Sequence, residues 1–91
     1  MDIRYERAAE EDLRGLVAAE RSQGHPDLEG FTKLLRLRIA AIGLFPHSGR
    51  PVRRTGVREW YLHGTPYIVL YLPHAAGVDI LRVLDAREVA A

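Results

Sequence analysis

The spacing of the hydrophobic residues changes twice along this chain, and this limits the folds that are open to it. Near the N-terminus, Ile3 and Tyr5 alternate with charged residues, which is typical of a short strand with one buried face. From about residue 7 to residue 45 the apolar residues recur every three or four positions, which predicts helices. Strand-like apolar runs return after residue 57. The order therefore predicts one strand, a helical region and then further strands.

Two helices are expected in the middle segment. The first, RAAEEDLRGLVAAERSQG, ends where Gly24 and Pro26 stop a helix, and the second begins at Asp27, whose side chain can cap it. Because the link is short, the helices are expected to form an antiparallel hairpin, and Pro46 ends the second helix. Two apolar stripes on the second helix predict that it packs on both a sheet and the first helix: Leu28, Phe31, Leu35, Ile39 and Ile42; and Leu34, Leu37, Ala41 and Leu44.

Three strands are expected after the helices: VREWYLH, YIVLYLP and VDILRVLDA. The segment YIVLYLP is apolar on both faces, as a central strand should be. In the last strand, simple alternation places Arg82 on the same face as Val78, Ile80 and Leu84. The predicted order is β-α-α-β-β-β, an α+β fold in which a helical hairpin packs on one face of an antiparallel-rich sheet.

The composition limits the class of protein. A chain of 91 residues with 47% hydrophobic residues is expected to form a single domain over residues 1–91. It has no cysteine, which excludes disulfides, thiolate metal sites and thiol nucleophiles. We find no metal-ligand spacing and no glycine-rich phosphate loop, so we expect no metal and no cofactor. The sequence lacks an apolar run of membrane-spanning length and a leader-like start, so we expect no membrane partner and a cytoplasmic location.

One segment, LFPHSGRPVRRTGVREW, is strongly basic, with no acidic residue before Glu59. The net charge of the chain is only +1, so this excess is local. Guanidinium groups bind phosphates and carboxylates, so the segment is suited to an RNA or DNA backbone or to an acidic peptide. It is also compatible with a solvated loop, and with internal pairing, for example of Arg58 with Asp85 across the sheet. Its arginines are Arg50, Arg53, Arg54 and Arg58.

Other polar and aromatic residues leave alternatives open. Arg82, a charge on an otherwise apolar strand face, either pairs internally or lines an open face of the sheet. Aromatic residues on the predicted strands are either core residues or platforms for stacked bases: Trp60, Tyr61, Tyr67 and Tyr71. All four histidines lie in predicted turns or at loop edges beside proline or glycine: His25, His47, His63 and His74. We therefore assign no catalytic residue from the pattern alone.

Five motifs, taken in order, resemble the ParE/RelE superfamily of toxins from bacterial type II toxin–antitoxin modules. The resemblance spans nearly the whole chain. IRYERAAEEDL is similar to the first strand and Ala-x-x-Asp-Leu helix start of the family, and PYIVLYLP to its Tyr-x-x-x-Tyr central strand. VDILRVLDARE resembles its closing Ile-Leu-Arg-Val-Leu-His-x-x-Arg strand. The other two matches are a Pro-x-x-Gly-Arg segment and a Val-Arg-Glu strand: Pro46, Gly49 and Arg50; and Val57, Arg58 and Glu59.

The superfamily contains two kinds of toxin. RelE-like members cleave mRNA in the ribosomal A site with clustered basic residues and often a C-terminal His or Tyr, whereas ParE-like members are implied to poison DNA gyrase. RelE-like chains tend to carry an arginine where this chain has Ile68, and the frequent His of the closing strand is Asp85 here. An aspartate repels a phosphate, so the chain lacks residues that an RNase site of this kind would use. The resemblance therefore favours a ParE-like inhibitor of gyrase that is neutralised by a cognate antitoxin.

Two other functions stay open. One is a RelE-like mRNA endonuclease acting with the ribosome, whose phosphate contacts would be Arg50, Arg58, Arg82 and Arg87. The other is a non-toxic module that only binds an antitoxin. In each case we expect a basic surface to meet the target or the antitoxin: Arg50, Arg53, Arg54, Arg58, Arg82 and Arg87. We expect a folding segment of the antitoxin to lie on apolar residues of the helical hairpin, unless these belong to the core: Leu37, Leu44 and Phe45.

Overall fold

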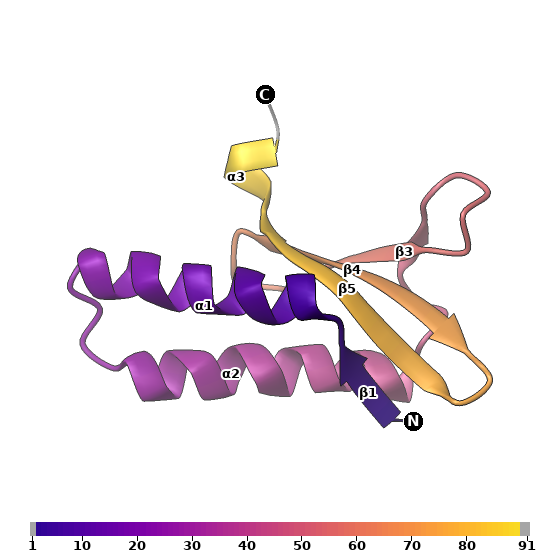
Figure 1. Ribbon diagram of the computed structural model, residues 1–91, viewed down its shortest axis with the longest axis horizontal. Helices are drawn as coiled ribbons and strands as arrows, with labels where there is room; N and C mark the ends of the chain where they lie inside the picture. The colour runs from indigo at the N-terminus through magenta and orange to yellow at the C-terminus, as the bar shows by residue number, and fades with distance from the viewer. Residues whose placement is uncertain (1, 90–91) are drawn as a thin grey trace.

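The protein folds into a five-stranded sheet with two long helices beside it, in a computed structural model that describes residues 2–89 (Figure 1). The predicted α+β class and the predicted order of helices and longer strands are confirmed. Three short elements, at residues 41–44, 50–51 and 86–89, were not predicted. The elements are β1 (Asp2–Tyr5), α1 (Arg7–Ser22), α2 (Leu28–Ala40), the 3₁₀ turn η1 (Ala41–Leu44), β2 (Arg50–Pro51), β3 (Arg58–Tyr61), β4 (Tyr67–His74), β5 (Gly77–Asp85) and α3 (Ala86–Val89).

The strands lie in the order β1-β5-β4-β3-β2, so β4 is central, as its two apolar faces predicted. β1 is parallel to β5, and the other neighbouring strands are antiparallel. β1 follows β5 only as far as the pair Tyr5–Ile80, whereas β5 continues to Asp85. Residues 81–85 of β5 therefore have no strand beside them on the β1 side within the described part of the chain.

Local signals in the sequence set the ends of the helices. Gly24 has φ +78° after α1, and the amides of Gly24 and His25 donate to the carbonyls of Arg21 and Glu20 at 3.1 and 3.0 Å. This is the Schellman arrangement, in which a left-handed glycine terminates a helix. Asp27 caps α2 as predicted, because its Oδ1 accepts the Gly30 amide at 2.9 Å. The two helices then run antiparallel, side by side (Figure 1).

The core lies between the helices and the sheet. One predicted stripe of α2 is buried there, with Leu35 and Ile39 at most 1% exposed, and η1 adds Ile42. α1 contributes Ala9 and Leu13 and packs along β5. Leu62, which directly follows β3, and the strands supply the rest of the buried cluster; the strand residues are Tyr67, Val69, Tyr71, Val78, Ile80 and Val83.

The second predicted stripe is not packed. Leu34, Leu37 and Leu44 are 45%, 69% and 72% exposed, so α2 contacts the first helix, as predicted, but not mainly through this stripe. The first stripe of α2 faces the sheet. The contact between α1 and α2 is made partly by polar groups. Arg36 of α2 binds Glu10 of α1 through two hydrogen bonds of 3.2 and 2.9 Å.

A bulge in β5 also changes the predicted faces of this strand. Tyr71 lies opposite Ile80, but Leu70 lies opposite Arg82, so Leu81 is an extra residue in β5. The alternation shifts there, and Val83 rather than Leu84 joins Val78 and Ile80 in the core. Arg82 is therefore not on the apolar face to which simple alternation assigned it.

Candidate functional site

The basic segment forms the outer hairpin of the sheet. Its two strands, β2 and β3, pair at Arg50–Glu59 and Pro51–Arg58, and the Val52 amide donates to the Val57 carbonyl at 2.8 Å. The loop beyond this bond projects from the sheet (Figure 1, upper right, beside β3). The four arginines of the segment lie at different levels of this hairpin and so have different surroundings.

Two of these arginines are engaged within the chain. Arg58 is half-buried, and its Nη1 donates to the carbonyls of His47 and Gly49 at 2.9 and 2.7 Å. Arg50 donates from Nε to Glu59 Oε1 at 2.6 Å, and this carboxylate raises the pKa of Arg50. The possibility that Arg58 pairs with Asp85 is therefore wrong, whereas its internal role is confirmed with different partners.

The other two arginines lie at the tip of the loop. Arg53 and Arg54 are exposed, and neither forms a hydrogen bond or ion pair with another residue of the described chain. They line a hollow of ≈ 470 Å³. Arg54 has φ +54°, a left-handed conformation that costs a residue with a side chain about 1–2 kcal/mol.

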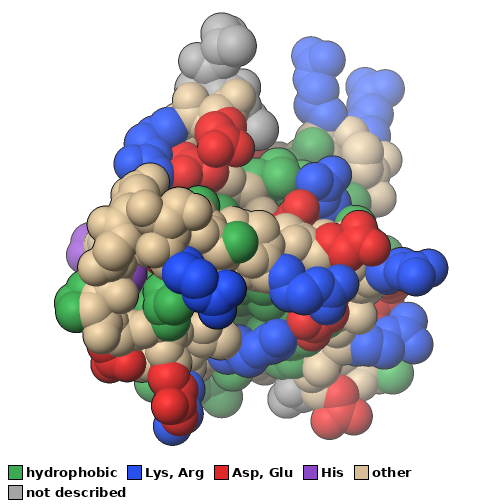
Figure 2. Space-filling model, turned by 60° about the vertical axis from the view of Figure 1, so that its left-hand side comes forward, with side chains coloured by type: hydrophobic (Ala, Val, Ile, Leu, Met, Phe, Trp, Pro, Cys, Tyr) green, Lys and Arg blue, Asp and Glu red, His purple; other side chains and the backbone are tan. Residues whose placement is uncertain are grey.

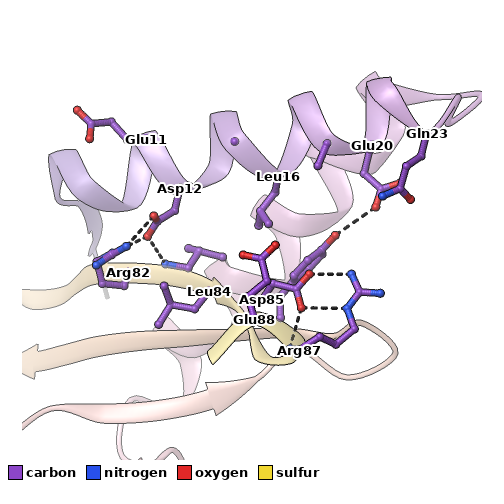
Figure 3. A pocket seen from close by; sticks show the side chains of 14 residues that line it. Glu11, Asp12, Leu16, Glu20, Gln23, Arg82, Leu84, Asp85, Arg87 and Glu88 are labelled. Carbon is purple, nitrogen blue, oxygen red and sulfur yellow. Dashed lines mark hydrogen bonds and ion pairs between the residues drawn. The ribbon is translucent and has the colours of Figure 1, made fainter. Parts of the chain in front are cut away.

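Arg82 lies in a groove between α1 and the unpaired part of β5 (Figure 3). Asp12 of α1 accepts hydrogen bonds from Arg82 Nε and Nη2 at 2.7 and 3.0 Å. The same carboxylate accepts the backbone amide of Val83 at 2.9 Å, so it serves as an acceptor where β5 has no neighbouring strand. Arg82 therefore pairs within the chain, and it does not line an open face of the sheet as a free charge.

Arg87 is held at the far end of the same groove. Asp85 accepts from Arg87 Nη2 at 2.7 Å and from its Nε at 3.0 Å, and the guanidinium lowers the pKa of Asp85 (Figure 3). Tyr67 donates from its hydroxyl to Glu20 at 3.3 Å, and burial, with the negative charge of Glu20, raises the pKa of Tyr67. The carboxylates that hold Arg82 and Arg87 were not identified from the sequence.

The charge balance of this groove does not suit a phosphate. Its volume is ≈ 390 Å³, and its lining contains two arginines, each bound to a carboxylate. Five acidic side chains line it: Glu11, Asp12, Glu20, Asp85 and Glu88. A phosphate entering here would meet an excess of negative charge and would have to compete for both guanidinium groups. The six arginines that the sequence singled out therefore do not form one basic surface.

An exposed apolar surface, which we call the α2–η1 patch, contains Leu37, Leu44, Phe45 and Trp60. The first three are 69%, 72% and 70% exposed, so the alternative that they belong to the core is wrong. Phe45 and Trp60 line a small hollow of ≈ 90 Å³ together with Ala41, Ile42 and Ser48. The sequence analysis considered Trp60 only as a core or base-stacking residue. Neighbouring side chains of a strand point to opposite faces, so either Trp60 or Tyr61 had to point away from the core.

Within residues 2–89, no set of three or more His, Asp or Glu side chains is placed to hold a metal ion. None of the helices described is both long enough and apolar enough to span a membrane.

Comparison with known proteins agrees with the fold and with the sequence motifs. The model of a family described as the ParE toxin of the type II toxin–antitoxin system, parDE, matches residues 3–90. A solved structure described as the chromosomal ParDE toxin–antitoxin system from P. aeruginosa is similar, with a TM-score of 0.78 and 20% identity over 91% of this chain and 92% of that chain. No curated protein matches the sequence. Because the family model covers nearly the whole chain, the protein belongs to the ParE toxin family of type II toxin–antitoxin systems.

Proposed function

We propose that this toxin inhibits DNA gyrase by binding it in the cytoplasm, without cleaving RNA, and that a cognate antitoxin neutralises it. The proposal that the toxin does not cleave RNA rests on the internal pairing of its arginines. Arg50, Arg82 and Arg87, three of the four arginines that an RNase site would use, are each bound to a carboxylate of the same chain. Guanidinium groups that are already paired offer little to a phosphate in a transition state.

Asp85 adds a second argument against RNA cleavage. It occupies the position where the closing strand of the superfamily often carries a histidine, and the pKa of its carboxyl is lowered by Arg87. A carboxyl with a lowered pKa stays ionised at neutral pH, so it holds no proton to give to a leaving group and repels the scissile phosphate. Arg58, the remaining candidate, is occupied by backbone carbonyls.

The gyrase proposal is tested with purified toxin. We expect the protein, released from its antitoxin, to block supercoiling of relaxed plasmid by gyrase or to accumulate gyrase–DNA cleavage complexes. Equimolar antitoxin should abolish either effect. Total mRNA from arrested cells should remain intact in primer extension, whereas ribosome-dependent cuts would support the endonuclease instead. A toxin that arrests growth but leaves gyrase unaffected in both assays contradicts the proposal, and a chain that causes no growth arrest is only a binding module.

We further propose that the antitoxin covers the α2–η1 patch. The patch has four exposed large apolar side chains, and two of them, Phe45 and Trp60, line a small hollow. A segment that folds onto the toxin would place an apolar side chain in the hollow beside Phe45 and Trp60. Burying this surface would offset the entropy lost when the segment becomes ordered.

The double variant Leu37→Ser/Phe45→Ser tests this surface. We expect its affinity for the cognate antitoxin to fall by about 10–100-fold in calorimetry, because two apolar contacts are lost. Both side chains are largely exposed, so the free energy of unfolding should change by less than about 0.5 kcal/mol. The matched control is Tyr61→Ser, since Tyr61 is 56% exposed and points to the opposite face of β3 from Trp60. Equal losses in the variant and the control would place the antitoxin elsewhere.

A further inference from the structure

We propose that the tip of the β2–β3 hairpin, formed by Arg53 and Arg54, contacts the phosphate backbone of the DNA held by gyrase. This inference rests on the proposed gyrase function, and it specifies which part of the toxin meets nucleic acid rather than protein. It follows from four properties of the tip: its two free charges, its rigid support, the backbone conformation of Arg54 and the lack of apolar side chains.

The charges at the tip are free, unlike those of the neighbouring arginines. In the described chain after residue 46, every other arginine is bound to a carboxylate or to carbonyl oxygens. Arg53 and Arg54 line their hollow by themselves, without an acidic residue. The loop that carries them projects from the sheet at the upper right of Figure 1, and Figure 2 shows basic side chains standing out from the face of the molecule that it draws. An external anion therefore gains these two contacts without breaking an internal one.

The support beneath the tip is rigid. Thr55 donates from its amide and its hydroxyl to the Val52 carbonyl at 3.2 and 2.6 Å, and its hydroxyl accepts the Val57 amide at 3.0 Å. Below them, the Arg50–Glu59 pair and the hydrogen bond from Arg58 to the Gly49 carbonyl join the two arms of the hairpin at its base. These hydrogen bonds hold the backbone of the loop in place, so binding loses little backbone entropy.

The backbone at Arg54 supports an external role for the side chain. Glycine, asparagine and aspartate adopt a positive φ most readily, and the neighbouring Gly56 does so at +80°. At position 54 the chain carries an arginine at φ +54° instead. Strained residues of this kind concentrate where the side chain contacts a ligand.

The chemistry of the tip favours DNA over an acidic protein surface. None of the large apolar side chains that are exposed in residues 2–89 lies in the loop 52–57. Protein interfaces are organised around a buried apolar or aromatic centre, whereas a DNA backbone is bound mainly by positive charge. Arginine suits this task because its planar fork can donate two hydrogen bonds to one phosphate.

The test compares Arg53→Gln/Arg54→Gln with Arg14→Gln/Arg21→Gln, which removes the same charge from two exposed arginines of α1. We expect the tip variant to bind a short labelled DNA duplex at least tenfold more weakly in anisotropy. The DNA-binding constant of the tip variant should also depend less on salt. The slope of its logarithm against the logarithm of the salt concentration should decrease in magnitude by about 1.8, the value for two lost phosphate contacts. The control should differ from the wild type by less than threefold. Arg54→Gly, which the backbone accepts, serves as a second variant that weakens DNA binding while the fold is kept.

Gyrase measurements separate this inference from the proposed function. We expect the tip variant to bind gyrase normally without DNA but to accumulate several-fold fewer cleavage complexes when DNA is present. Equal effects in the tip variant and the control overturn the inference, and so does weaker binding of the tip variant to gyrase without DNA, which would indicate an acidic protein contact. If the wild type does not bind gyrase, the proposed function fails, and the anisotropy comparison still decides whether the tip contacts DNA.

Discussion

Tyr71→Ala is expected to remove a large part of the free energy of unfolding of this protein. Tyr71 is the largest fully buried side chain, 0% exposed at the centre of β4, and its removal would open a cavity between the sheet and the helices. Replacing a buried aromatic residue by alanine costs about 3–5 kcal/mol. A domain of this size has a total free energy of unfolding of only about 5–15 kcal/mol, so the loss is a large part of it. Urea unfolding followed by circular dichroism measures the effect.

Tyr71→Phe separates the hydroxyl from the ring. The Tyr71 hydroxyl accepts the Gly49 amide at 2.9 Å in a buried setting, and Gly49 in turn accepts from Arg58. We expect a loss of about 1–3 kcal/mol, because the Gly49 amide would have no acceptor. Tyr61→Phe is the control, since Tyr61 is 56% exposed and its change should stay within about 0.5 kcal/mol. If Tyr71→Phe is as stable as the wild type, this hydrogen bond does not hold the base of the basic hairpin.

Asp12→Ala is expected to lower the free energy of unfolding and to expose the edge of β5. The side chain of Asp12 is only 16% exposed, and it accepts three hydrogen bonds from Arg82 and Val83. The cost of leaving the Val83 amide without an acceptor is about 1–3 kcal/mol. The freed edge could then pair with another chain, so we also expect association at high concentration. Urea unfolding and light scattering measure the two effects.

Two matched variants test whether the lost hydrogen-bond acceptor causes the decrease in the free energy of unfolding. Asp12→Asn keeps an oxygen that can accept the Val83 amide, so it should retain part of the stability that alanine loses. Glu11→Ala changes a neighbouring carboxylate whose contact with Arg7 is an exposed ion pair at 3.6 Å, so it should have little effect. An Asp12→Ala protein that is as stable as Glu11→Ala, and monomeric, would show that β5 does not need this acceptor.

Patterns that are local in the chain were predictable. The Leu35 and Ile39 stripe, the Asp27 cap and the Gly24 stop each depend on residues a few positions apart, and all three occur as expected. The central position of β4 followed in the same way from its two apolar faces. The motifs in their order also identified the toxin family, because they cover nearly the whole chain.

The arrangement of the candidate site was less predictable. Arg58 and Arg50 looked unpaired because the segment has few acidic residues, but backbone carbonyls bind Arg58 and a residue of the opposite strand binds Arg50. Arg82 meets Asp12 across 70 positions of sequence, and an extra residue in β5 changes the faces of the strand near it. These contacts depend on which elements pack together, and hydrophobic spacing does not contain that information.

The amino-acid sequence by itself determined the class of fold, the end of α1, the start of α2, the central strand and the family of this protein, whereas α2 ends at Ala40 and not at the predicted Pro46, because the 3₁₀ turn η1 follows it. The tertiary structure alone decided which arginines are free and which apolar stripe of α2 is covered, leaving Arg53 and Arg54 at the tip and Leu37 in the patch. The physical reason is the separation in sequence between the residues that determine each property. Helix and strand periods result from neighbours within a few residues, whereas burial and charge pairing depend on contacts between segments that are distant in sequence.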